Sequence, residues 1–390
     1  MEKVRVGIIG IGNMGSSHAQ KLAAGEVEEM ELTAVCDKKE TRRQWAKERL
    51  PKTVAIFEDA TALMDSGIVD AVVIATPHYD HPVLVQEALK KGLHAISEKP
   101  AGVYTKQVRE MNEAAKNSDK VFGMMFNQRT NCVYRKMYEL VHSGVYGKIK
   151  RVNWIITDWY RSQAYYNSGG WRATWDGEGG GVLLNQCPHN LDLIQWICGM
   201  PSKVQAFCHE GKWHDIEVED DVTAYLEYPN GATGVFVTTT ADAPGTNRFE
   251  VTMEKAKLVC EGDQLQLYVL KENEREYCYT TTEGFKKPDG DYVEVLTDGE
   301  NPQHMGVFKA FAGKILHNTP LVADGVEGIH GLELSNAMHL SSWLNKPVTL
   351  PIDEDLFLQM LNNKRANSKK KDHVTEVTFD TEGSYGSKKE

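Results

Sequence analysis

Regular alternation between short apolar runs and helix-like segments over residues 1–126 constrains the fold more than any other sequence feature. Val4–Ile9 is a nearly continuous apolar run, as expected for a strand that is buried on both faces. Similar runs recur at Leu32–Cys36, Ala71–Ala75 and Leu93–Ile96, with helix patterns between them. Strands that alternate with helices form βαβ units, so we expect a parallel, doubly wound sheet with helices on both faces.

A glycine-rich turn, GIGNMG, follows the first of these runs. It fits the pattern G-x-G-x-x-G, which indicates a dinucleotide site when a strand precedes it and a helix follows it. The first glycine permits a tight turn, the second lets the main chain approach a pyrophosphate, and the third lets the helix pack closely on the strand. The helix N-terminus then presents free N–H groups to the phosphates. The residues that we expect to contact a dinucleotide here are Gly10, Gly12, Asn13, Met14 and Gly15.

An acidic residue, Asp37, ends the second apolar run. A carboxylate at that place accepts hydrogen bonds from the hydroxyls of an adenosine ribose and repels a 2′-phosphate. The position therefore predicts NAD in preference to NADP, although the neighbouring Lys38 weakens that preference. An aspartate that caps a helix and binds no ligand is the alternative interpretation.

Composition and charge exclude several classes of partner. The formal net charge is −11, and duplex binding is driven by a basic surface, so we expect no nucleic-acid partner. No apolar run approaches the ~20 residues that span a bilayer, and we expect no signal peptide, because Met1-Glu2-Lys3 runs directly into the first apolar strand pattern. The 7 cysteines are scattered and form no C-x-x-C pair. We expect a cytoplasmic protein without membrane contacts.

After residue 126 the regular alternation of strand and helix patterns ends. We expect helices at about 132–142 and from about Val182, and several strands between Val204 and Val269 that are separated by turns. This pattern indicates a largely antiparallel sheet. The expected domains are a dinucleotide-binding domain at 1–126, a substrate and oligomerisation domain at 127–361, and a polar C-terminal tail at 362–390.

Three further motifs complete a family resemblance. They are ATPHYDH at Ala75–His81, Glu98-Lys99-Pro100, and GGGVLLNQCPH at Gly179–His189. Together with the glycine turn, they resemble the motifs of the glucose–fructose oxidoreductase, inositol dehydrogenase and MocA family (Gfo/Idh/MocA). The resemblance implies a Rossmann domain and a second domain built on an open, mostly antiparallel sheet. It also implies a homo-oligomer, dimer or tetramer, that is formed through that sheet.

The resemblance implies catalytic roles for residues in two of these motifs. Oxidation of an alcohol needs a base for the hydroxyl proton and positive charge near the developing alkoxide. In the family, the matching lysine and histidine supply these, which assigns Lys99 and His189. Asn185 stands where the family commonly has aspartate, and an amide cannot accept the proton. A nearby carboxylate then has to help unless His189 acts alone; the candidates are Asp176, Glu178 and Asp192.

The resemblance also implies which residues contact the nicotinamide half of the cofactor. Besides those of the glycine turn and Asp37, they are Thr76, Pro77, His78, His81, Glu98, Lys99 and Asn127. His78 and His81 form an H-x-x-H pattern that invites a metal interpretation. Flanking prolines and the absence of a nearby third ligand argue against it, so we expect no metal.

An aromatic loop at residues 154–175 holds four of the 8 tryptophans. Flat rings beside arginine and aspartate suit stacking on the C–H faces of a sugar or on an aromatic aglycone. A subunit interface or a packed cluster would favour the same residue types. The expected substrate contacts are Arg129, Tyr160, Arg161, Trp171, Arg172, Trp175, Asp176, Asn185 and His189.

These expectations describe an enzyme that passes a hydride between NAD and a secondary hydroxyl of a carbohydrate. The best specific expectation is C3 of a glucosyl unit, because glucoside 3-dehydrogenases occur in the family. Alternatives are an inositol or other polyol dehydrogenase, and a glycoside-cleaving enzyme that oxidises the sugar transiently. A regulatory protein that senses NAD would need neither Lys99 nor His189.

Overall fold

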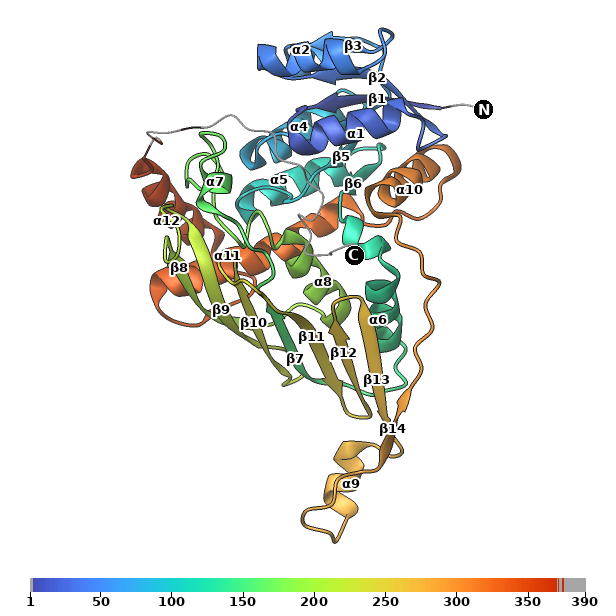
Figure 1. Cartoon of the computed structure of the whole chain (residues 1–390), viewed down its shortest axis with the longest axis vertical. Coiled ribbons are helices and arrows are strands. Elements are labelled where there is room, and N and C mark those ends of the chain that lie inside the picture. Colours follow the sequence, from blue (N-terminus) through green and yellow to red (C-terminus); the bar gives the residue numbers. More distant parts are fainter. Residues whose placement is uncertain (1–2, 370, 372–373, 375–390) are drawn as a thin grey trace.

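The computed structural model describes residues 3–369, 371 and 374, which form two sheets with their covering helices (Figure 1). The first sheet has six parallel strands in the order β3-β2-β1-β4-β5-β6, which confirms the predicted doubly wound sheet. Its strands are β1 (Val4–Ile9), β2 (Met30–Cys36), β3 (Ala55–Phe57), β4 (Ala71–Ile74), β5 (His94–Ser97) and β6 (Phe122–Met124). The direction of winding reverses between β1 and β4, and ligands bind outside the carboxyl ends of the strands at such a point.

Helices of the first half connect these strands. They are α1 (Asn13–Ala23), α2 (Glu40–Arg49), α3 (Ala60–Met64), α4 (His81–Lys90) and α5 (Thr105–Lys116), with short 3-10 turns η1 (His78–Asp80) and η2 (Asn127–Thr130). The strands read as apolar runs because both faces are covered, and every residue of β4 is buried.

The second sheet has nine strands in the order β14-β13-β12-β11-β7-β10-β9-β8-β15. β7 pairs with β10 in parallel and every other pairing in this sheet is antiparallel, as expected. Its strands are β7 (Ile149–Ile156), β8 (Lys203–Glu210), β9 (Glu219–Glu227), β10 (Thr233–Thr239), β11 (Asn247–Met253), β12 (Ala256–Glu261), β13 (Gln264–Leu270), β14 (Gly290–Val293) and β15 (Val348–Thr349). The helices of this half are α6 (Cys132–His142), α7 (Gln163–Tyr166), α8 (Pro188–Cys198), α9 (Glu274–Thr280), α10 (Gln303–His317), α11 (Gly328–Leu344) and α12 (Glu354–Ala366), with the turn η3 (Gly325–Glu327).

Among the described residues, helices cover one face of the second sheet and leave side chains of the other face exposed. On the covered face the rings of Trp154 and Phe249 stack with centroids 4.2 Å apart, and α8 and α11 pack over the strands (Figure 1). On the other face Ile155, Phe207 and Tyr225 are exposed. Alternation of buried and exposed side chains along each strand produces this division.

Helix α10 joins the two halves. It follows strand β14 of the second sheet in sequence, yet it lies beside α1 and β6 of the first sheet (Figure 1). Its Phe308 and Phe311 are buried in the same apolar cluster as Val6 and Ile8 of β1. A helix from the second half of the chain therefore completes the core around the dinucleotide-binding sheet.

Two expectations about element boundaries need correction. Helix α8 begins at Pro188 and not near Val182, because the Glu219 carboxylate accepts the N–H groups of Gly181 (2.8 Å) and Leu183 (3.0 Å) and holds this segment outside a helix. The tail expected from residue 362 begins inside α12. Two cations in the last turn of that helix form ion pairs, and cations are favourable at a helix C-terminus.

Most of the expected tail lies outside the described residues. In the described part of the chain, no helix combines the length and the apolar character needed to cross a membrane.

Candidate active site

The glycine turn between β1 and α1 leaves an open approach to the start of the helix. Gly10 has φ +87°, and a Cβ there would lie 2.6 Å from the Ala75 carbonyl oxygen. A Cβ on Gly15 would lie 1.8 Å from the Gly10 oxygen, so the helix could not pack as it does. A Cβ on Gly12 would meet nothing within 4 Å. Gly12 therefore faces open space, as the approach of a pyrophosphate requires.

Asp37 lies beside this turn, at the end of β2. Its Oδ2 accepts the N–H of Ile11 at 3.0 Å, and its Oδ1 accepts the N–H of Lys39 at 2.9 Å. These bonds fix the carboxylate next to the glycine turn, where it can also accept ribose hydroxyls. The nearby Arg43 donates to the carbonyl oxygens of Asp37 (2.9 Å) and Lys38 (2.7 Å) and forms an ion pair with Glu40.

The segment after β4 closes the other side of the turn. The Oγ1 of Thr76 is buried and has no hydrogen-bond partner among the described residues, which suits a polar group of the cofactor. The two ring nitrogens of His81 contact the carbonyl oxygens of Pro100 (2.7 Å) and Thr76 (2.8 Å). Both nitrogens are thus committed to the protein. His81 therefore joins two loops, and its expected contact with the cofactor stays a prediction.

His78 faces the second half of the chain. Its Nδ1 lies 3.1 Å from the carbonyl oxygen of Glu178, and its ring meets Trp171 edge to face with centroids 5.7 Å apart. Burial first, and then the neighbouring His81 and Lys99, hold the pKa of His78 well below its usual value. A neutral His78 at this place links the cofactor loop to the aromatic loop.

Lys99 lies at the end of β5 and reaches the second domain. Its Nζ donates to the carbonyl oxygen of Asn185 at 2.8 Å. Burial lowers its pKa, while the carboxylates of Glu98 and Glu178 oppose that shift. The ammonium group is therefore held between the two halves of the chain, close to the start of α8.

Asn185 is paired with a buried carboxylate. Its Nδ2 donates to Glu178 Oε1, whose other oxygen accepts the N–H of Ala173. The guanidinium of Arg172 lies 3.7 Å from the same Oε1. Of the three candidate carboxylates, Glu178 is the one that the fold places beside Asn185.

His189 is the second residue of α8 and is 3% exposed. Burial first, and then the charge of Lys99, hold the pKa of His189 well below its usual value, against an opposing effect of Glu98. The positive end of the α8 dipole also disfavours an imidazolium ion there. His189 is thus a neutral imidazole near neutral pH, which is the form that accepts a proton. Its ring meets Phe126 edge to face, with centroids 6.4 Å apart.

Arg129 was expected to contact the substrate, but the structure places it in a buried ion pair. Its guanidinium forms two hydrogen bonds to Asp192 (2.8 and 2.6 Å) and a further one to Glu327 (2.5 Å). All but a small part of the side chain is buried, and it also lies over the ring of Trp196. These contacts make Arg129 and Asp192 a buried ion pair behind the site, so neither is retained as a substrate contact or as a candidate base.

Some side chains of the aromatic loop pack in the core, and others lie near the candidate site. Trp154 and Trp175 are buried. Trp175 packs edge to face on His339 and Trp343, both at 5.6 Å, so its expected substrate role is corrected to packing. Asp176 is exposed and forms an ion pair with Arg365 at 3.1 Å, which also removes it from the site.

Arg172, which lies beside Glu178, also contacts two aromatic rings of the loop. The guanidinium of Arg172 lies over the rings of Tyr165 (4.4 Å) and Trp171 (4.9 Å). Arg161 donates to the carbonyl oxygen of Tyr160, whose side chain is 54% exposed. Stacked rings and cations next to an exposed aromatic side chain can bind a polar molecule that has flat apolar faces.

Sequence reasoning missed three residues near the cofactor segments. They are His18 in α1 and Gln303 and His304 at the start of α10. His18 falls in an ordinary amphipathic helix pattern, and Gln303 and His304 precede an apolar helix as capping residues do. Only their distant partners Glu98 and Asn127 identify them, and a single sequence does not reveal such pairs.

Comparisons with known proteins agree with this geometry. Residues 4–126 match the model of an oxidoreductase family with an NAD-binding Rossmann fold, and residues 134–259 match the GFO/IDH/MocA C-terminal domain. The myo-inositol 2-dehydrogenase of Thermotoga maritima is 24% identical over 340 residues, which are 86% of this chain and 95% of that protein. The D-glucoside 3-dehydrogenase of Escherichia coli is 28% identical over 251 residues, which are 58% of this chain and 68% of that protein.

A solved structure extends the comparison to the whole fold. The WlbA dehydrogenase of Chromobacterium violaceum, in complex with NADH and UDP-GlcNAcA, aligns with a TM-score of 0.78 and 26% identity. The alignment covers 90% of this chain and 97% of that one.

Proposed function

This chain belongs to the Gfo/Idh/MocA family of oxidoreductases and has an NAD-binding Rossmann domain, and we propose that it oxidises a secondary hydroxyl of a sugar or glycoside. One observation carries the proposal. Lys99, at a strand end of the dinucleotide-binding sheet, reaches the segment of Asn185 and His189 at the start of α8. We infer that the ammonium group of Lys99, the amide of Asn185 and the neutral imidazole of His189 act together between the two domains, beside the expected nicotinamide.

Lys99, Asn185 and His189 each have a different role in the proposed oxidation of an alcohol. NAD, when bound, supplies the hydride acceptor. His189 takes the hydroxyl proton, because burial keeps its imidazole neutral. Lys99 stabilises the negative charge that develops on the same oxygen. Asn185 orients the hydroxyl, since its amide donates and accepts hydrogen bonds but cannot accept the proton.

Asn185 lacks the negative charge of the aspartate that is common at this position in the family. We propose that the carboxylate of Glu178 supplies that charge. Glu178 accepts a hydrogen bond from the Asn185 amide and is 1% exposed, so its charge is poorly screened. Burial raises the pKa of Glu178, while Arg172, the N–H of Ala173 and the Asn185 amide oppose that shift and favour the charged form. It favours the ammonium form of Lys99 and opposes the loss of that charge through burial. An amide in contact with a buried carboxylate thus replaces the single aspartate that is common in the family.

The aromatic loop supports a sugar or glycoside as the substrate. The ring of Trp171 lies next to His78, and the guanidinium of Arg172 lies over the same ring. We propose C3 of a glucosyl unit as the oxidised carbon, in line with the similarity to a D-glucoside 3-dehydrogenase. An inositol is the second candidate, since the myo-inositol 2-dehydrogenase of Thermotoga maritima is similar over 86% of this chain.

The proposal is tested by release of nucleotide from the denatured protein, followed by NADH absorbance with a panel of sugars, inositols and glucosides. We expect one class to yield NADH, and His189→Ala to lower kcat by about 10²–10⁴. Exposed His317, replaced by alanine, is the control. Products without net NADH would favour the glycoside-cleaving alternative, and a chain that cannot bind NAD would contradict the proposal.

The open face of the second sheet supports a homo-oligomer, dimer or tetramer. Phe207 and Tyr225 are 52% and 41% exposed on neighbouring strands, β8 and β9, and contribute to a shallow apolar patch with Val235. Exposed apolar patches of this kind mark contact surfaces. All seven cysteines are free thiols, so we also propose a reducing cytoplasm as the location of the enzyme.

A further inference from the structure

The N-terminus of α10 contacts the segment that follows β6. The Oε1 of Gln303 accepts hydrogen bonds from the side-chain amides of Asn127 and, at 3.1 Å, of Gln128. Asn127 is fully buried, and its Oδ1 has no hydrogen-bond partner among the described residues. Gln303 therefore turns the Asn127 amide so that its oxygen is left for another donor. The carboxamide of nicotinamide is a donor of that kind.

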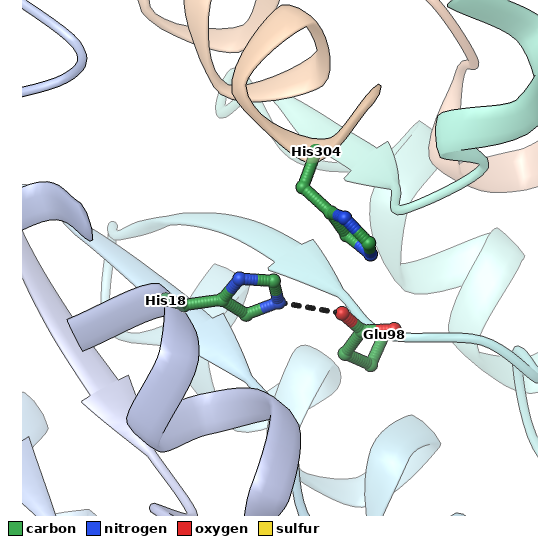
Figure 2. Close-up of side chains that lie close together, drawn as sticks. All are labelled: His18, Glu98 and His304. Carbon is green, nitrogen blue, oxygen red and sulfur yellow. Dashed lines mark hydrogen bonds and ion pairs between the residues drawn. The ribbon is translucent and has the colours of Figure 1, made fainter. Parts of the chain in front are cut away.

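The next residue, His304, faces the segment that follows β5. Figure 2 shows His304 directed toward His18 and Glu98, with the three side chains coming from α10, α1 and the end of β5. The rings of His18 and His304 have centroids 5.2 Å apart. Phe308, one turn further along α10, meets His18 edge to face at 5.1 Å.

Glu98 connects this cluster to Lys99. Its Oε1 lies 2.7 Å from His18 Nε2, and its Oε2 accepts the main-chain N–H of Lys99 at 3.3 Å. Burial opposes the charge of Glu98, but the hydrogen bond of His18 and the charges of His18, His304 and Lys99 lower its pKa to about 2. The carboxylate therefore stays charged and holds the main chain from which the Lys99 side chain extends.

The same three side chains have the composition of a zinc site, but the geometry does not fit one. Two ligand atoms at about 2.0 Å from a tetrahedral zinc ion lie roughly 3.3 Å apart. The contact of 2.7 Å between His18 Nε2 and Glu98 Oε1 is too short for two ligands of one metal, whereas it is an ordinary charge-assisted hydrogen bond. The cluster is thus a hydrogen-bonded support.

We propose that Gln303 and His304 are positioning residues for the nicotinamide end of NAD. Gln303 sets the amide of Asn127, and His304 confines the Glu98–His18 pair that fixes the Lys99 main chain. Neither residue belongs to the Rossmann domain in sequence, so the nicotinamide site is complete only when α10 is docked on the first sheet. The inference rests on the proposed function only in requiring that the chain binds NAD.

The test uses the full chain and two variants. His304→Phe keeps a ring of similar size against His18 and removes both ring nitrogens, and Gln303→Met keeps the length and removes the acceptor. Lys309→Ala, on the exposed face of α10, is the control. NADH binding is measured by fluorescence without any sugar, together with the thermal midpoint and the KM values for NAD and for sugar.

We expect each variant to raise the Kd for NADH about tenfold, while the control leaves it unchanged. The KM for NAD rises with it, the KM for sugar stays within about twofold, and His304→Asn restores part of the affinity. A merely structural role would lower the thermal midpoint without separating the two KM values. Because binding is measured without sugar, a wrong substrate assignment does not affect this result.

Two results would overturn the inference. One is NADH affinity equal to that of the unmodified chain in both folded variants. The other is a stoichiometric divalent metal in the purified protein that is lost in His304→Phe. If one variant fails to fold, the other still decides, since Gln303 and His304 are proposed to act through different segments.

Discussion

The surroundings of each histidine decide what its ring can do. His81 has carbonyl oxygens at both nitrogens and therefore joins two loops. His189 lies in an apolar, positively charged setting that keeps it neutral, as a base must be. His18 and His304 flank a carboxylate. Sequence motifs identified the first two as site residues, but only the contacts separate a supporting ring from a proton acceptor.

The charge states of His189 and Lys99 predict the pH dependence of sugar oxidation. The neutral form of His189 is active, and its pKa lies well below 6.5, so the rate stays level as the pH falls through about 6.5 and drops only in more acidic solution. The charged form of Lys99 is active, and burial lowers its pKa from 10.5, so the rate falls as the pH rises through a value below that. A profile of kcat/KM against pH checks both limbs. An acid limb centred near 6.5 would contradict the assignment.

Glu178→Gln is predicted to move the alkaline limb. Glu178 favours the ammonium form of Lys99, so its loss lowers the pKa of Lys99 further and the rate falls at a lower pH. We expect kcat to fall about tenfold as well, because the charge beside Asn185 is lost. The measurement is the pH profile of the variant beside that of Asp176→Asn, which alters an exposed carboxylate. Identical alkaline limbs in the two variants would contradict the role of Glu178.

At the scale of elements, the sequence predicted a strand or helix correctly where the local pattern of apolar residues alone determines the element. The apolar run of β1 was readable, and so was the series of strands between Val204 and Val269. The start of α8 was not, because the Glu219 carboxylate, from a strand in the second sheet, holds the preceding segment in a turn. Local sequence propensity does not reveal a hydrogen-bond partner that comes from a distant strand.

The glycine turn allows a matched pair of substitutions. Gly12→Ala adds a methyl group in open space, so we expect the free energy of unfolding to change by less than about 1 kcal/mol while the Kd for NADH rises at least about tenfold. Gly15→Ala places a methyl group against the Gly10 carbonyl, so we expect a loss of about 1–3 kcal/mol in the free energy of unfolding.

Denaturant unfolding and NADH fluorescence distinguish the two variants. A stable Gly12→Ala variant with unchanged affinity for NADH would show that the pyrophosphate does not approach this glycine.

At the scale of the whole molecule, sequence patterns located the two sheets but not the contacts between distant segments. Arg129 pairs with Asp192 and Glu327, and Asp176 pairs with Arg365, across separations that no local pattern encodes. The docking of α10 on the first sheet is of the same kind. The candidate catalytic residues were readable because motifs carried them, whereas the division of the aromatic loop between core and site was not.

We predict that a charge placed on the exposed face of the second sheet changes the oligomeric state. Phe207→Glu places a charge in the apolar patch, so we expect the oligomer to dissociate toward monomers. Light scattering after size-exclusion chromatography measures the mass, and substitution of the exposed Val83 of α4 by glutamate (Val83→Glu) is the control. A chain that is monomeric before substitution, or an oligomer that Phe207→Glu leaves intact, would contradict an interface at this face.

The central claim is that hydride leaves a sugar carbon for NAD in the site between Lys99 and His189. The most direct measurement is incubation of the enzyme and NAD with a glucoside deuterated at C3, followed by mass spectrometry of the nucleotide. We predict that the reduced nucleotide carries the deuterium, and that His189→Ala forms little of it. Reduced nucleotide without deuterium would contradict oxidation at C3, and failure to transfer hydride from any sugar or polyol would contradict the claim itself.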